Sequence, residues 1–165
     1  MITRRQLTPS DMTDITRLEA DLYVPALRIS DASFRQLLAL FADGALGVFD
    51  DGNLCGFVFA LPLRSGTVLD LDAPLEQLPS DADALYIHNL GVAPAHRGRG
   101  LADELIAAAF AVARSRRLRV CELVSVHGSE PFWERYGFER LAAFEYAPGE
   151  PATQMRKALP VGTSR

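Results

Sequence analysis

The sequence is poor in cysteine and in long apolar runs, and each shortage counts against a class of protein. The two cysteines, Cys55 and Cys121, lie inside apolar runs, which favours two buried reduced thiols over a disulfide. No apolar run approaches the roughly 20 residues of a membrane-spanning helix, and the first residues contain no hydrophobic signal core. The sequence therefore predicts a cytoplasmic protein with no membrane partner.

Positive charge is also in deficit, because the formal net charge at pH 7 is -4. A nucleic-acid-binding module normally carries a basic excess. The segment RSRRLR at 114–119 is basic, but it lies at the C-terminal end of an expected helix, where cations are favourable without any partner. No nucleic-acid partner is expected. The absence of a Gly-Lys pair excludes a P-loop.

What the sequence does contain is the composition of an ordinary globular protein, with 165 residues, 48% hydrophobic and 23% charged. A single domain spanning residues 1–165 is expected. Apolar periodicity predicts strands at 2–8, 45–63 (a hairpin turning at Asp51-Gly52), 84–92, 119–126 and 152–159. It predicts helices at about 10–22, 31–41, 101–117 and 130–138. The order β-α-α-β-β-β-α-β-α-β indicates a mixed sheet with helices on both faces, while 64–83 is expected to be a mobile surface excursion.

One short segment is unusual for a structural turn. Residues 93–106, APAHRGRGLADELI, place two arginines and two glycines between a proline and a helix. Gly98 and Gly100 would let a ligand approach the backbone, and Arg97 and Arg99 add positive charge. Free N–H groups and the helix dipole suit an anion there, above all a phosphate. A tight turn with solvated arginines is the alternative.

A dinucleotide-binding fingerprint is a second interpretation of this turn. Gly98 and Gly100 fit its first two glycines, and Glu122 is an acid about 20 residues further on. However, Asp103 holds the position of the third glycine, and too few residues follow for the rest of such a sheet. NAD is therefore the weaker candidate ligand.

The segment LGVAPAHRGRGLADELI resembles the acyl-CoA-binding signature of the GNAT acetyltransferase superfamily, which is Arg or Gln, two residues, Gly, one residue, then Gly or Ala. Arg97, Gly100 and Ala102 meet it, and the later PFWERYGFE is similar to the aromatic short helix ending in Gly-Phe of that family. The resemblance implies an α+β fold with a central mixed, mostly antiparallel sheet of six to seven strands and helices on both faces. It also implies acetyl-CoA as co-substrate and no metal.

The resemblance further assigns residues to the co-substrate. The turn would wrap the CoA pyrophosphate with backbone N–H groups, the strand before it would pair with the pantetheine arm, and an N–H near Leu90 could stabilise the oxyanion. The strands at 84–92 and 118–126 would splay apart there. The cofactor-binding residues expected on this basis are Leu90, Gly91, Val92, Arg97, Gly98, Arg99, Gly100, Leu101 and Ala102.

Catalytic residues are expected on the same basis. His88 stands where many family members place a Glu or His base, and imidazole titrates near neutrality. Glu122, acting through a water, and His127 are other candidates for the base. The usual thiolate acid is a tyrosine, but that position holds Trp133, which cannot serve. Tyr136 is the hypothesised donor, with Ser129 or a water as alternatives.

Few residues in the sequence indicate which acceptor the protein uses. In this family the first two helices and their loop shape the acceptor side, where Glu19 and Asp21 could attract a cationic amine and Tyr23 suggests a partly apolar rim. A small-molecule amine and a peptide amino group both stay open, as does a homodimer. The sequence thus predicts an N-acetyltransferase, with a catalytically impaired acyl-CoA-binding sensor or scaffold as the alternative.

Overall fold

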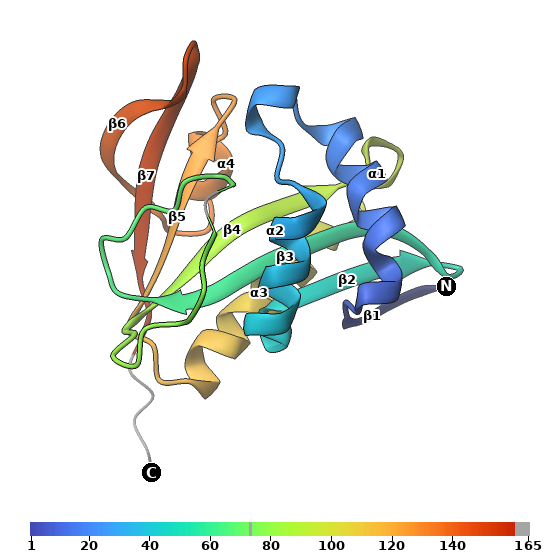
Figure 1. Ribbon diagram of the computed structural model, residues 1–165, viewed down its shortest axis with the longest axis horizontal. Helices are drawn as coiled ribbons and strands as arrows, with labels where there is room; N and C mark the ends of the chain where they lie inside the picture. Colours follow the sequence, from blue (N-terminus) through green and yellow to red (C-terminus); the bar gives the residue numbers. More distant parts are fainter. Residues whose placement is uncertain (73, 161–165) are drawn as a thin grey trace.

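The computed structural model describes residues 1–72 and 74–160. In this part of the chain seven strands form one sheet in the order β1-β2-β3-β4-β5-β7-β6 (Figure 1). Neighbouring strands are antiparallel except β4 and β5, which run parallel. The mostly antiparallel α+β fold is therefore confirmed. The strands are β1 (Ile2–Gln6), β2 (Ala45–Asp50), β3 (Asn53–Leu63), β4 (Ala84–Val92), β5 (Val120–Val126), β6 (Glu139–Ala147) and β7 (Glu150–Ala158).

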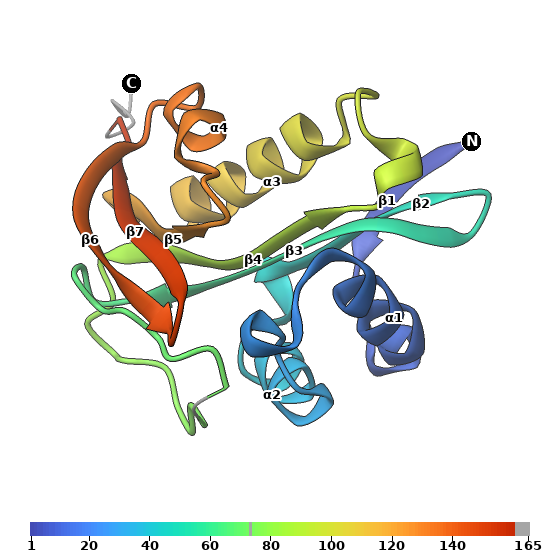
Figure 2. The ribbon, with the colours of Figure 1, turned by 90° about the horizontal axis from the view of Figure 1, so that it is seen from above.

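Helices cover both faces of the sheet, as expected. α1 (Met12–Leu22) and α2 (Asp31–Leu40) lie on one face, and α3 (Leu101–Ser115) and α4 (Glu130–Glu134) lie on the other (Figure 2). Each of the long helices has an apolar stripe at helical spacing, and these stripes are buried against the strands, as Ile15 and Leu18 of α1 and Leu105 and Ala109 of α3 illustrate. Among the described residues, no helix has the length and apolar character needed to cross a membrane.

The hairpin at Asp51-Gly52 forms as predicted, linking β2 to β3. Both turn residues have positive φ, 47° for Asp51 and 84° for Gly52, which is the conformation that a two-residue hairpin turn requires. Cys55 and Cys121 are both buried free thiols, as expected.

Strand β6 is missing from the predicted order of elements. Its residues, ERLAAFEYA, are mostly exposed, because β6 is an edge strand that pairs only with β7. With no face fully buried, the strand carries no alternation of apolar and polar residues that periodicity could detect. Helix α3 also ends at Ser115, two residues before the predicted end at Arg117, which has a positive φ of 57°.

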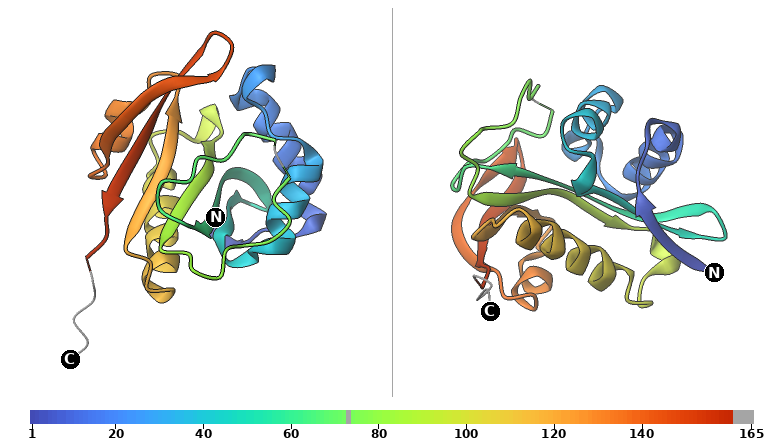
Figure 3. Two further views of the ribbon diagram at one scale, coloured as in Figure 1. Left: turned by 60° about the vertical axis from the view of Figure 1, so that its left-hand side comes forward. Right: turned by 90° about the horizontal axis from the view of Figure 1, so that it is seen from below.

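The long connection between β3 and β4 runs outside the sheet beside α2 (Figures 1 and 3). Contacts tie it down at several points. Asp72 accepts hydrogen bonds from the Ser33 hydroxyl (2.6 Å) and the Ser30 N–H (3.0 Å), and the Leu75 N–H donates to the Gln36 amide oxygen (3.0 Å). These hydrogen bonds hold the connection against α2.

The centre of the sheet contains a split, as the resemblance predicts. β4 and β5 pair only between Ala84–Ile87 and Val120–Leu123, although β4 continues to Val92 and β5 to Val126. On its other edge β4 carries a bulge, because Phe59 faces Asn89 while Ala60 faces Ile87, which leaves His88 as the extra residue. The bulge and the split coincide at His88.

Candidate active site

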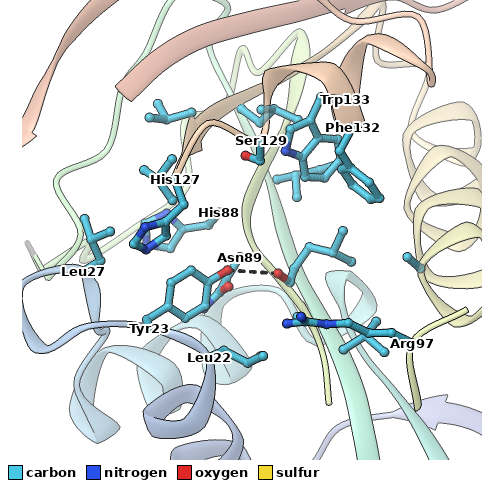
Figure 4. Close-up of a pocket in the computed structure, with 18 of the residues that line it drawn as sticks. Leu22, Tyr23, Leu27, His88, Asn89, Arg97, His127, Ser129, Phe132 and Trp133 are labelled. Carbon is cyan, nitrogen blue, oxygen red and sulfur yellow. Dashed lines mark hydrogen bonds between the residues drawn. The ribbon is translucent and has the colours of Figure 1, made fainter. Parts of the chain in front are cut away.

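A cavity of about 890 Å³ occupies the split between β4 and β5 (Figure 4). It extends from the glycine-arginine turn and the start of α3 to the connection between α1 and α2. We call the first part the turn end, formed by Arg97, Gly98, Gly100, Leu101, Ala102 and Asp103. We call the opposite part the far end, formed by Tyr23, Val24, Leu27, Leu71, His127 and Tyr146. Residues 88–92 of β4 lie between the two ends.

The two glycines of the turn end have the backbone conformation that their type allows. Gly98 and Gly100 both have a φ of 77°, in the left-handed region, and Gly100 caps the N-terminus of α3. A Cβ atom added at either glycine would meet no protein atom within 4 Å, so the space beside both is open. The turn thus leaves its backbone accessible from the cavity.

The start of α3 presents unpaired backbone donors to this space. The first helical bond runs from Glu104 N–H to Gly100 O, so the N–H groups of Leu101, Ala102 and Asp103 have no partner inside the helix. These donors and the positive end of the helix dipole form an anion-binding arrangement.

The two arginines of the turn point to different places. Arg97 lines the cavity, and no ion pair joins it to a carboxylate within the described residues. Arg99 instead binds Asp50 at the end of β2, with Nη1 at 3.0 Å from Oδ2, and it does not line the cavity. The Arg99 guanidinium holds the pKa of the Asp50 carboxyl below its usual range. Of the two side chains, only Arg97 is available to a ligand in the cavity.

The middle of the cavity exposes the backbone of β4. The Tyr23 hydroxyl, at the end of α1, donates a hydrogen bond of 2.9 Å to the Leu90 carbonyl of β4 (Figure 4). This carbonyl therefore faces the cavity rather than β3. Because the N–H and C=O of a strand residue point to the same side, the Leu90 N–H faces the cavity as well. Burial raises the pKa of Tyr23, so its hydroxyl stays protonated.

His88 lies on the bulge and faces the cavity. Its Nδ1 is buried and has no hydrogen-bond partner among the described residues. Burial lowers the pKa of His88 to about 4, against smaller opposing effects of the Leu71 backbone and the Asp72 charge. The imidazole is therefore neutral at pH 7 with its Nδ1 unpaired within the described part of the chain, although the same burial makes it a weaker base than an exposed histidine.

His127 forms part of the far end, directly after β5. Its φ of 56° is in the left-handed region, which costs a non-glycine residue about 1–2 kcal/mol, and Gly128 follows with a φ of 66°. The ring lies 6.3 Å from that of Tyr23 (centroid to centroid) and beside it in Figure 4. Strained residues of this kind are concentrated at functional sites.

Aromatic residues from α4 and the turn after it form the wall opposite β4. Phe132, Trp133 and Tyr136 all line the cavity, and Ser129 lies at the start of α4 without forming a side-chain cap. The Tyr136 hydroxyl donates to the Asp103 carboxylate at the turn end. Burial and Asp103 together raise the pKa of Tyr136 to about 12.

Glu122 lies outside the cavity lining. Its Oε1 accepts hydrogen bonds from the Ser65 hydroxyl (2.7 Å) and the Gly66 N–H (3.0 Å), and Arg156 Nη2 lies 3.3 Å from the same oxygen. These partners use the carboxylate to fix the start of the β3–β4 connection. The geometry therefore gives a general-base role for Glu122 no support.

The cavity brings together most of the residues that the sequence singles out. Of the predicted set, Glu122 and Arg99 do not line it, and those that do are Leu90, Gly91, Val92, Arg97, Gly98, Gly100, Leu101, Ala102, His88 and Tyr136. Sequence reasoning missed Asn89, Asp103 and Tyr146. No local signal marks Tyr146, because it reaches the cavity from the unpredicted strand β6. Among the described residues, no three His, Cys, Asp or Glu side chains gather as metal ligands.

Comparison with known proteins identifies the family to which a chain of this sequence is similar. The family model described as the acetyltransferase (GNAT) family matches residues 12–138. No match was found among curated proteins.

Solved structures share the fold over nearly the whole chain. Ard1 from Thermoplasma volcanium is 16% identical, with a TM-score of 0.77 over 96% of this chain and 98% of that chain. Naa50 from Arabidopsis thaliana, in complex with the bisubstrate analogue CoA-Ac-MVNAL, is 15% identical, with a TM-score of 0.75 over 96% and 99%. The ribosomal-protein-S18-alanine N-acetyltransferase from Escherichia coli is 15% identical, with a TM-score of 0.71 over 100% and 97%.

Proposed function

Because this chain belongs to the GNAT acetyltransferase family, we propose that it is an acetyl-CoA-dependent N-acetyltransferase that moves an acetyl group directly to a primary amine. One observation carries the proposal. The open left-handed turn before α3 and the cavity-facing Leu90 N–H line the same cavity, in the order that the diphosphate and the thioester of one extended molecule would need. We include in the proposal a single domain and a cytoplasmic location, which suits two free thiols.

Each part of the co-substrate has a proposed contact. The pyrophosphate binds the N–H groups at the start of α3 and the Arg97 side chain. The pantetheine arm lies along Leu90, Gly91 and Val92, where β4 has no strand partner on that edge. The Naa50 structure, whose ligand joins CoA to a peptide, is consistent with a cavity that holds both substrates.

The reaction is a direct displacement. The neutral amine attacks the thioester carbon, a C–N bond forms, the C–S bond breaks, and the CoA thiolate leaves. The Leu90 N–H stabilises the negative charge on the carbonyl oxygen. His88, neutral at pH 7, takes the proton that the amine loses. Tyr136 donates the proton that the thiolate gains.

Ligand-induced stabilisation tests the proposal. We expect acetyl-CoA or CoA at about 100 times its Kd to add roughly 2.7 kcal/mol to the free energy of unfolding. In a chain of this size that raises the melting temperature by about 5–10 °C, while NAD and ATP should leave it unchanged. A larger rise with NAD, or none with either CoA species, would overturn the proposal.

A pair of glycine variants isolates the turn. Gly100→Leu should abolish the rise with CoA, because its side chain enters the open space of the turn end. Gly149→Leu is the matched control, since Gly149 also has a left-handed φ of 75° with open space beside it but lies outside the cavity. Binding of acetyl-CoA without transfer to any amine would instead favour an acyl-CoA-binding sensor, the alternative that Trp133 at the usual acid position suggests.

A further inference from the structure

The far end of the cavity contains no carboxylate. Asp103, at the turn end, is the only Asp or Glu among the described residues that line the cavity. Positions 73 and 161–165, which lie outside the described residues, carry no acidic side chain. The walls of the far end are mainly apolar or aromatic, as Leu27, Leu71 and Tyr146 illustrate.

The two acids expected to attract a cationic acceptor are not available to it. Glu19 is buried at 2% exposure, and its Oε1 accepts the Ile29 N–H (2.9 Å) while its Oε2 accepts the Asn89 amide N–H (2.8 Å). Burial raises the pKa of Glu19, which further disfavours a negative charge there. Asp21 is exposed and does not line the cavity.

A third acid lies near the far end but is also engaged. Asp72 accepts hydrogen bonds from Ser33 and Ser30 at the start of α2, and it does not line the cavity. The charge of Asp72 reaches His88, but no carboxylate lines the far end, so a second positive charge on an acceptor would have no direct ion-pair partner among the described residues there. Burying an unpaired ammonium costs several kcal/mol, whereas the reacting amine loses its own proton before it attacks.

An uncharged hydrogen-bond acceptor is present instead. Asn89 lines the cavity at 6% exposure, and its amide nitrogen is directed at Glu19. Because this contact uses the amide nitrogen, the amide oxygen of Asn89 points away from Glu19. The Asn89 Oδ1 is left buried without a partner among the described residues. An oxygen of this kind can accept the N–H of a neutral amine without neutralising a charge, and Figure 4 shows Asn89 on β4 beside Tyr23 of the far end.

On the basis of the proposed function, we propose that the acceptor is a primary amine on an apolar substituent with no second cationic group. A small arylalkylamine and the α-amino group of a peptide with an apolar, uncharged first residue share this chemistry. Polyamines do not, because their remaining cations would have to enter the far end unpaired.

Binding to the CoA-loaded protein tests this inference separately from turnover. The dissociation constants of 2-phenylethylamine, a tetrapeptide with N-terminal Leu and no charged side chain, and 1,4-diaminobutane would be measured by calorimetry. We expect 2-phenylethylamine or the peptide to bind at least about tenfold more tightly than 1,4-diaminobutane, and which of them binds identifies the source. Equal or tighter binding of the diamine, or no binding of any amine, would overturn the inference. Failure of CoA itself to bind would overturn the proposed function instead.

A carboxylate introduced into the far end sharpens the test. Val24 lines the cavity at 42% exposure, so Val24→Asp adds a negative charge there without opening the core. We expect it to improve the Kd of 1,4-diaminobutane about 3–10-fold, the effect of a partly exposed ion pair, and to weaken that of 2-phenylethylamine. Val68→Asp is the matched control, because Val68 is 37% exposed and lies outside the cavity. An equal gain in both variants, or none in Val24→Asp, would count against the inference.

Discussion

The two ends of the cavity are built in different ways. The turn end comes from one short segment, 97–103, and its donors are the backbone N–H groups of Leu101, Ala102 and Asp103, which α3 leaves unpaired. The far end is assembled from side chains that are distant in the sequence, such as Tyr23, Leu71 and Tyr146. A backbone site recognises a chemical group common to many ligands, whereas a side-chain site is specific to one acceptor. On the proposed function, the turn end would bind the CoA that the family has in common, and the far end would determine which acceptor this protein uses.

Loss of the imidazole between the two ends should have the largest effect. His88→Ala should lower kcat about 100-fold, the low end of the usual contribution of a general base because burial makes His88 a weak one, without changing the Kd of acetyl-CoA. Steady-state kinetics with calorimetry on the same preparation measures both quantities. His127→Ala is the comparison, because His127 also lines the cavity but follows β5 and is not on the β4 bulge. If His127→Ala lowers kcat more than His88→Ala does, His127 at the far end is the general base and His88 is not.

Acid should destabilise the protein through the same residue. The pKa of His88 is lowered to about 4 in the folded state, below the unfolded value of about 6.5. As the pH falls below 6.5 the unfolded state binds the proton first, so stability that is present above pH 6.5 is lost on the way to pH 4.

The expected loss is about 2–3 kcal/mol between pH 7 and pH 4.5 beyond that of His88→Gln, measured by denaturant unfolding. His88→Gln removes this titration, whereas the carboxyl groups titrate alike in both proteins. Equal losses in wild type and variant would mean that His88 is solvated when the protein is folded.

The contrast between the ends also explains what the sequence could predict. Strands β1 to β5, the hairpin at Asp51-Gly52 and the turn end depend on local patterns, and they were predictable from consecutive residues. The far end depends on tertiary contacts. Strand β6, which supplies Tyr146, has no periodic pattern, and neither Arg99 nor Glu122 could be placed without knowing that Asp50 and Ser65 come close to them.

Glu122→Gln distinguishes a structural carboxylate from a catalytic one. Because Glu122 binds Ser65, Gly66 and Arg156 away from the cavity, we expect the variant to lose about 2 kcal/mol of unfolding free energy, as hydrogen bonds to a charged group are worth 1.5–3. Its kcat should stay within about threefold of the wild-type value. The matched control is Glu145→Gln on the exposed face of β6, which should change neither quantity. A loss of kcat at unchanged stability would restore Glu122 as a candidate base.

Tyr136→Phe tests the donor of the thiolate proton. Its hydroxyl lies at the cavity wall and binds Asp103, with a pKa raised to about 12, so it is a protonated but weak acid at pH 7. We expect kcat to fall about tenfold, which is less than the usual effect of a well-matched acid because water can replace a weak donor. Near-wild-type turnover would reject Tyr136 and direct attention to Ser129, which Ser129→Ala would then test.

The smallest effect is expected from the two arginines of the turn, which are close in the sequence but whose side chains point in different directions. Arg97 lines the cavity, and its removal in Arg97→Ala should weaken CoA binding about 5–10-fold, in keeping with one charge-assisted contact to phosphate. Arg99 binds Asp50 on the opposite side of the turn, so Arg99→Ala should change the CoA Kd less than about twofold and cost only a surface ion pair of at most about 1 kcal/mol. Calorimetric titration of both variants with CoA at low and moderate salt measures the difference, which salt should reduce for Arg97 alone. Equal effects would mean that Arg99 leaves Asp50 when the phosphate binds, and the turn end would then be a charged site rather than one built mainly from its backbone.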